Sequence, residues 1–99
     1  MTKKLQIVID HYGADHQLSK VIEEQAELVH VIARRLQSKE WDKESFLEEF
    51  ADVYLIFDQL KLIYCAETGM DLQQLNNALN KRMNEKMKRT IRRMNKESV

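Results

Sequence analysis

The chain has 99 residues, and its 16 basic and 16 acidic side chains give no net charge. It lacks proline and has only two glycines and one cysteine, Cys65. These features predict a single all-α domain, residues 1–99, and exclude an intrachain disulfide and a cysteine-based zinc site. No segment approaches the roughly 18 uninterrupted apolar residues of a membrane span, and no signal-peptide pattern is present. We therefore expect a cytoplasmic protein without a membrane partner.

Two helices are expected in the first 40 residues. The first runs from about Lys3 to Gly13, a residue suited to the left-handed conformation that closes helices. Asp15 is the expected N-cap of the second, which reaches about Gln37. Its predicted apolar face consists of Leu18, Val21, Ile22, Leu28, Val29, Ile32 and Leu36.

Two further helices follow a connector at residues 38–41. Asp42 is the expected N-cap of the third helix, which continues to about Glu67 and is terminated by Gly69. Asp71 is the expected N-cap of the fourth. The fourth helix is amphipathic, with apolar residues at Leu72, Leu75, Leu79, Met83, Met87, Ile91 and Met94.

Two carboxylates lie on the apolar side of the third helix. At about 100° of rotation per residue, Glu49 and Asp52 fall in the same wedge as a predicted core stripe. The stripe consists of Val53, Ile56, Leu60 and Ile63. Acidic side chains are rarely buried unless they are paired or bind a metal, so this position indicates a cation, most simply a divalent metal.

A second acidic pair on the preceding helix is predicted to join the first. The short connector makes the second and third helices antiparallel neighbours. Glu24 and Glu27 then lie at a height similar to that of Glu49 and Asp52, given a rise of about 1.5 Å per residue. Four carboxylates plus water and phosphate oxygens suit magnesium, which rarely takes an all-protein cage.

These residues resemble the MazG-like all-α nucleoside triphosphate pyrophosphohydrolases, in their short phage and bacterial form. The run from Val21 to Leu28 is similar to the EExxE motif of that family, and the run from Glu48 to Val53 is similar to its ExxD motif. The resemblance extends over roughly Leu18 to Leu60.

The resemblance implies hydrolysis of a nucleoside triphosphate to a monophosphate and pyrophosphate, with Mg²⁺ required and Mn²⁺ as a substitute. Carried over by position, it implies four metal ligands: Glu24, Glu27, Glu49 and Asp52. Glu23 and Glu48 match accessory acidic positions with a catalytic role. Metal-assisted attack of water on the α-phosphorus needs no covalent intermediate.

Other contacts to the nucleotide are expected outside the acidic motifs. The basic run on the last helix is similar to the family's phosphate-binding residues, which implies Lys86 and Arg89, with Lys81 as a competing position. A nucleobase is usually held by aromatic stacking. The candidates are Trp41, Phe46 and Tyr54, and Trp41 is favoured because a tryptophan in a polar connector has less reason to be in the core.

Self-association is also expected. Leu47, Leu55 and Leu62 lie off the predicted core stripe of the third helix, so a single hairpin leaves apolar surface uncovered. The hairpin and its flanking helices are predicted to form a four-helix bundle on dimerisation, as a homodimer or a dimer of dimers.

Alternative functions remain open at this stage. A non-catalytic helical oligomer or an RNA-binding module would use the basic C-terminal helix, although no aromatic residues lie between its charges to stack bases, which disfavours a nucleic-acid partner. Glu27 and His30 form one Glu-x-x-His pair of the di-iron type, but a second pair is missing. Possible substrates include dUTP, dCTP, oxidised nucleotides and general NTPs. The related phosphoribosyl-ATP pyrophosphatases normally have a Tyr-His pair that is lacking after Asp52.

Overall fold

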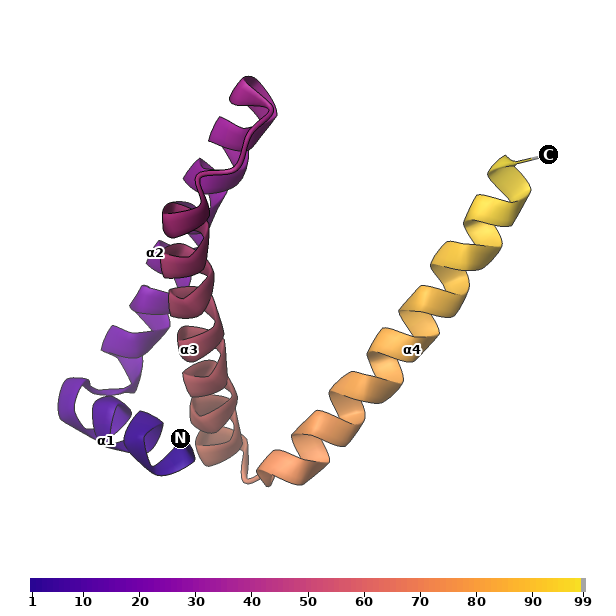
Figure 1. Ribbon diagram of the computed structural model, residues 1–99. Coiled ribbons are helices and arrows are strands. Elements are labelled where there is room, and N and C mark those ends of the chain that lie inside the picture. Colours follow the sequence, from indigo (N-terminus) through magenta and orange to yellow (C-terminus); the bar gives the residue numbers. More distant parts are fainter. Residues whose placement is uncertain (99) are drawn as a thin grey trace. The chain divides into compact units, whose positions relative to one another are not determined.

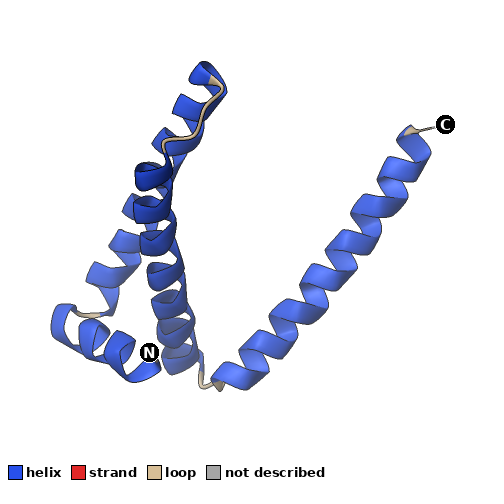
Figure 2. Cartoon of the chain, viewed as in Figure 1, coloured by secondary structure: helices blue, strands red, loops and turns tan. Residues whose placement is uncertain are grey.

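The computed structural model describes residues 1–98, which form four α-helices and no strand (Figures 1 and 2). In chain order they are α1 (Thr2–Tyr12), α2 (Ala14–Ser38), α3 (Lys43–Thr68) and α4 (Leu72–Glu97). The all-helical prediction is therefore confirmed. The chain divides into two compact units, Met1–Tyr64 and a second that begins at Cys65. Within the described part of the chain, none of the helices has the length and apolar character required to span a bilayer.

One glycine separates α1 from α2. Gly13 has a φ of 92°, and its N–H donates to the carbonyl oxygen of Ile9 at 2.7 Å, closing α1. The prediction that Asp15 caps α2 is wrong, because the helix begins at Ala14 and Gly13 is its N-cap. The positive φ of glycine lets the chain turn within a single residue, so α2 restarts before Asp15. Asp15 lies instead in the first turn, where its charge is favourable to the helix dipole.

The other predicted helix boundaries follow local hydrogen bonding. The Oδ1 of Asp42 accepts from the Ser45 backbone N–H at 3.1 Å, as expected of an N-cap. Asp71 and Gln74 form a reciprocal capping box at the start of α4. Gly69 follows α3 with a φ of 77°, which a residue with a side chain rarely adopts. These three boundaries are confirmed.

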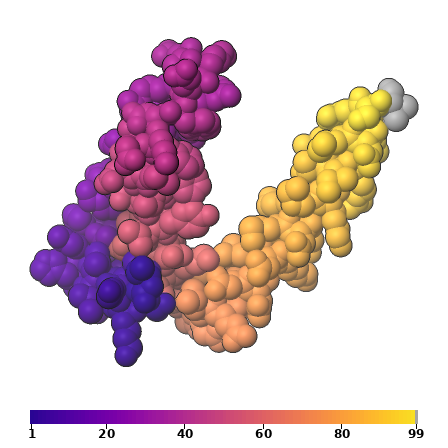
Figure 3. Space-filling model, in the orientation of Figure 1, coloured from indigo at the N-terminus to yellow at the C-terminus, as the bar shows by residue number. Residues whose placement is uncertain are grey.

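The first unit is an antiparallel hairpin of α2 and α3, with α1 folded beside its open end (Figure 1). The helices α2 and α3 adjoin in the space-filling view (Figure 3), and the side chains of Gln17 and Gln59 form a hydrogen bond between them. The predicted core positions Val53, Ile56 and Ile63 are buried, and Leu60 is half-buried. The other buried apolar residues in the described part of the chain are Leu5, Ile9, Val21 and Val31.

The predicted apolar face of α2 is only partly correct. Val21 is buried, and Leu18 and Leu28 are half-buried. The remaining four predicted residues are exposed: Ile22, Val29, Ile32 and Leu36. The helix has apolar residues on two sides, and α3 covers only the side that includes Val31. The exposed four form a second face, which we call the outer α2 face.

The helix α4 is described separately, since it belongs to the second unit. Its described residues include none that is buried, and five of its larger apolar side chains are exposed: Leu79, Met83, Met87, Ile91 and Met94. The start of the helix is stabilised by the capping box at Asp71.

Candidate metal centre

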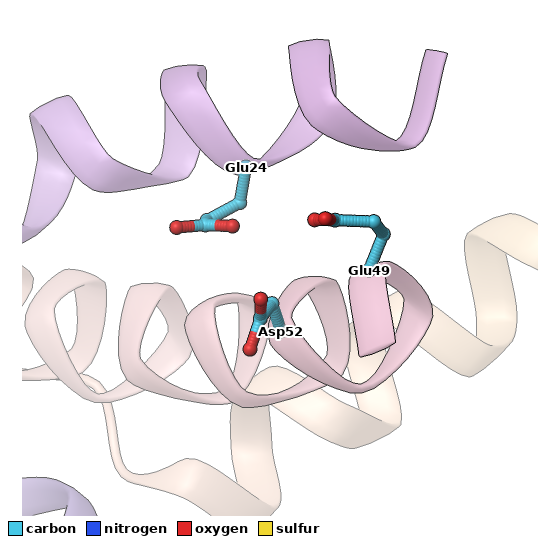
Figure 4. A group of neighbouring side chains, drawn as sticks. All are labelled: Glu24, Glu49 and Asp52. Carbon is cyan, nitrogen blue, oxygen red and sulfur yellow. The ribbon is translucent and has the colours of Figure 1, made fainter. Parts of the chain in front are cut away.

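Three of the predicted carboxylates converge between α2 and α3. Glu24 on α2 and Glu49 and Asp52 on α3 each offer one oxygen, and the three oxygens lie within 4.8 Å of one another. Figure 4 shows the Glu24 side chain extending from its helix toward the two acids of the facing helix. Glu49 and Asp52 are three residues apart, which places them on the same side of α3. We call these three residues the acidic centre.

Two acids of this centre have raised pKa values, because of desolvation first and neighbouring like charges second. The pKa of Glu24 is raised, mainly because partial burial disfavours its charged form and then because of the Asp52 and Glu49 carboxylates. The pKa of Glu49 is raised by desolvation and next by the charges of Glu27 and Asp52. The folded chain thus holds these acids at an electrostatic cost that a bound cation would relieve.

The donor set fits a small divalent cation. Magnesium binds oxygen ligands at 2.0–2.1 Å, so ligands on opposite sides of an ion are about 4.2 Å apart. Because adjacent ligands of an octahedral ion are only about 3 Å apart, carboxylate oxygens separated by up to 4.8 Å must draw together by side-chain rotation to share one ion. All three side chains are half-buried, which leaves room for water or phosphate oxygens to complete the coordination.

The fourth predicted ligand, Glu27, lies outside this group of three. Its side chain is exposed, yet its charge contributes to the raised pKa of Glu49. Glu27 is therefore close enough to act on the centre electrostatically, and its role as a ligand stays a prediction.

The two accessory acids flank the centre on exposed surface. Glu23 forms an ion pair with Lys20, with 3.1 Å between the Lys20 Nζ and the Glu23 carboxylate oxygen. Glu48 is exposed beside Glu49 on α3. Neither belongs to the group of oxygens within 4.8 Å. Their catalytic role stays a prediction.

The predicted phosphate-binding residues are all exposed on α4. Lys81, Lys86 and Arg89 belong to the second unit of the chain. Arg89 lines two shallow basic hollows on that helix, one shared with Arg82 and Lys88, and both shared with Arg92. This is a surface that can bind anions, and the assignment of Lys81, Lys86 and Arg89 to nucleotide phosphates stays a prediction.

Trp41 lies in the connector between α2 and α3. Its ring packs edge-on against Phe46 with centroids 5.4 Å apart, and the guanidinium carbon of Arg35 lies 5.8 Å from the ring centroid. The tryptophan is 53% exposed and, with Lys43 and Phe46, lines a hollow that does not include the acidic centre.

A larger cavity adjoins the acidic centre and includes residues that were not predicted from the sequence. It has a volume of about 460 Å³ and is lined by Glu24 and Asp52. Further lining residues are Tyr12, His16, Gln17, Lys20 and Gln59. Gln17 and Gln59 are 5% and 7% exposed, and the Nε2 of Gln17 donates to the Oε1 of Gln59 at 2.7 Å.

One sequence signal could have identified Gln59. It lies three residues after Ile56 and four before Ile63, on the same apolar stripe that drew attention to Asp52. A polar residue at such a position needs a partner, since an unpaired buried amide is costly. The partner, Gln17, precedes the first buried valine of α2 by one turn and has no comparable signal.

Comparisons with known proteins give no family assignment for this chain. The chain matches no protein-family model, no curated protein and no solved structure.

Proposed function

We propose that this protein is a magnesium-dependent pyrophosphohydrolase that converts a nucleoside triphosphate, NTP or dNTP, to a monophosphate and pyrophosphate. The observation that carries the proposal is the convergence of Glu24, Glu49 and Asp52 on oxygens within 4.8 Å of one another. Such a group is costly unless it binds a cation. The cavity beside it provides space for the rest of a nucleotide.

The residues divide the chemical task between them. Glu24, Glu49 and Asp52 hold the metal, with Glu27 as the fourth ligand. The metal, when bound, supplies neutralisation of phosphate charge and a lowered pKa of bound water. The water oxygen bonds to the α-phosphorus, and the bond from that phosphorus to the α,β-bridging oxygen breaks to release pyrophosphate. A flanking carboxylate, Glu23 or Glu48, accepts the proton of the water.

The basic face of α4 complements this chemistry. Acidic side chains outnumber basic ones in Met1–Tyr64, whereas basic side chains dominate from Cys65 onward. Pyrophosphate is a highly charged leaving group, and lysine and arginine stabilise its charge through strong hydrogen bonds. Lys86 and Arg89, with Lys81, are proposed for this role. Trp41 is proposed as the alternative stacking residue, for a nucleotide whose base lies in the separate hollow near the connector.

Self-association is proposed on the basis of exposed apolar surface. The outer α2 face is uncovered, with Ile22 73% exposed and Leu36 59% exposed. On α3, Leu47 is 52% exposed and Leu55 is 40% exposed. A four-helix bundle formed by two copies of the hairpin would cover such faces, either as a homodimer or as a dimer of dimers.

The experiment that tests the catalytic proposal is pyrophosphate release. The wild type would be incubated with each common NTP and dNTP, with and without Mg²⁺, beside Asp52→Asn and Asp58→Asn. Asp58 is an exposed acid on α3 outside the acidic centre, so its variant is a matched control. Magnesium-dependent release that is lost only in Asp52→Asn supports the proposal. Equal release from both variants, or none from any nucleotide, contradicts it.

A second function is kept because α4 has an exposed basic face. A non-catalytic oligomer or an RNA-binding module would use this helix without needing the acidic centre. Thermal denaturation with and without millimolar Mg²⁺ separates the two proposals. A protein that binds the ion in its folded state melts at a higher temperature by mass action, whereas an RNA-binding helix has no reason to respond.

A further inference from the structure

We infer that the cavity beside the acidic centre holds the nucleobase, and that the Gln17–Gln59 pair selects a base with an oxo group, a 4-oxopyrimidine or a 6-oxopurine, over the corresponding amino base. The inference rests on the proposed function for its class of ligand, a nucleotide. It goes beyond that function by assigning the part of the molecule that distinguishes one nucleotide from another.

The first step is the spacing of the glutamines from the acids. Gln17 precedes Glu24 by seven residues on α2, and Gln59 follows Asp52 by seven residues on α3. In antiparallel helices these two steps run in the same direction, two helical turns or about 10.5 Å along the hairpin. A nucleotide with its phosphate at the acidic centre can extend along the cavity and present the far edge of its base to the glutamines.

The second step is the direction of the hydrogen bonds. The Oε1 of Gln17 lies 2.7 Å from the Nδ1 of His16, and since a carbonyl oxygen only accepts, Nδ1–H is the donor. The Nε2 of Gln17 then donates to the Oε1 of Gln59. This relay, from His16 through Gln17 to Gln59, occupies the oxygen of Gln59. The Nε2 of Gln59 carries the two N–H groups that this relay leaves unused, and Gln59 lines the cavity.

The third step is the chemistry of the base edge. The edge farthest from the sugar carries either an oxo group, which accepts a hydrogen bond, or an amino group, which donates one. An amide N–H forms a hydrogen bond with an oxo group but is repelled by the N–H of an amino group. Turning the oxygen of Gln59 outward would require Gln17 to turn with it and His16 to adopt the other tautomer, if the buried hydrogen bond is to be kept. The pair therefore favours the oxo form.

Aromatic rings supply a surface for the flat face of the base. Tyr12 and His16 line the same cavity and stack with centroids 5.1 Å apart and ring planes 17° apart. Tyr12 is 56% exposed, so its ring is accessible to a ligand. Stacking on such a ring does not distinguish one base from another. The discrimination between oxo and amino bases therefore depends on the Gln17–Gln59 pair.

The test measures binding without catalysis. Wild-type protein would be titrated calorimetrically with dUMP, dCMP, dIMP and dAMP in saturating Mg²⁺, because the ion offsets repulsion between the phosphate and the acidic centre and a monophosphate has no pyrophosphate to release. We expect dUMP to bind at least about tenfold more tightly than dCMP, and dIMP to show the same preference over dAMP, because one hydrogen bond is exchanged for an opposed pair of donors. Equal binding, a preference for the amino bases, or no binding overturns the inference.

Three variants make the test specific. Gln59→Glu places a second acceptor oxygen in the cavity and should reverse the preference toward dCMP. Gln59→Met replaces the amide oxygen and nitrogen by an apolar side chain of similar volume and should abolish the preference. Gln37→Glu makes the same chemical change as Gln59→Glu on exposed surface and should leave the preference unchanged. Circular dichroism checks that each variant folds. If Gln59→Glu does not fold, the base preferences of the wild type and of Gln59→Met still test the inference.

The outcomes of this test are independent of those for catalysis. Selective binding of dUMP without pyrophosphate release from any triphosphate would overturn the proposed function and leave the base pocket in place. Magnesium-dependent release of pyrophosphate, with no difference in binding between oxo and amino bases, would support the proposed function and overturn the base pocket.

Discussion

Glu24 and Asp52 face each other from adjacent antiparallel helices, with a carboxylate oxygen of each within 4.8 Å of the other (Figure 4). Lys20, one turn from Glu24, is paired with Glu23, and its effect on the Glu24 carboxylate is smaller than that of Asp52. The two acids therefore repel each other in the metal-free chain. This relationship is the basis of the first three predictions.

Removing one of these charges should stabilise the metal-free protein. In Asp52→Asn, loss of repulsion with Glu24 is expected to raise the free energy of unfolding by about 1 kcal/mol, the size of an interaction between unit charges at this separation in a watery environment. Pyrophosphate release should fall by at least about 100-fold, since a metal ligand is lost. Urea denaturation and the release assay measure the two effects. A destabilised Asp52→Asn would indicate a structural role for this acid.

The stability of the metal-free protein should decrease with rising pH in the mildly acidic range. The pKa values of Glu24 and Glu49 are raised in the folded chain, so folding strengthens proton binding at both. Their protonated forms contribute stability that is complete below the ordinary value of 4.5 and is lost as the pH rises through the folded values. Thermal denaturation across this range in EDTA should reveal the decline.

Magnesium is the control for this pH dependence. Because the ion binds the ionised carboxylates, saturating Mg²⁺ should oppose the decline at higher pH. In the double variant Glu24→Gln, Glu49→Gln the decline should be absent with or without the ion. If the double variant keeps the full pH dependence, other groups cause it.

Lys86→Ala should weaken nucleotide binding more than it slows turnover. The side chain is proposed to contact phosphate rather than the reacting water, so we expect KM to rise several-fold with a smaller change in kcat. Steady-state kinetics with the best triphosphate measure both constants. Lys3→Ala, an exposed lysine on α1, is the matched control. Unchanged kinetics in Lys86→Ala would remove this residue from the phosphate site.

A charge on the outer α2 face should disrupt the proposed assembly. Leu36→Asp places a carboxylate among exposed apolar residues, and we expect it to shift the protein toward monomer in sedimentation velocity experiments. Gln37→Asp, at the neighbouring exposed position, should leave the assembly intact. A wild-type protein that is already monomeric at micromolar concentration would contradict the proposed dimer.

The sequence by itself determined the helices and most of their ends. Gly13 and Gly69 adopt positive φ values, and Asp42 and Asp71 cap the helices that follow them. These features depend on the conformation and hydrogen bonds of a few neighbouring residues, so they can be predicted locally. The core stripe of α3 was also predictable, because its helical period is regular from Val53 to Ile63.

Only the tertiary structure decided which side of α2 is covered. The helix has two apolar faces, and its rotation about its own axis is set by packing against α1 and α3 rather than by its own pattern. That rotation buries Val31, exposes Ile32, and brings Glu24 but not Glu27 into the group with Glu49 and Asp52. It also joins Gln17 to Gln59 across 42 residues of sequence, a hydrogen bond that local periodicity cannot predict.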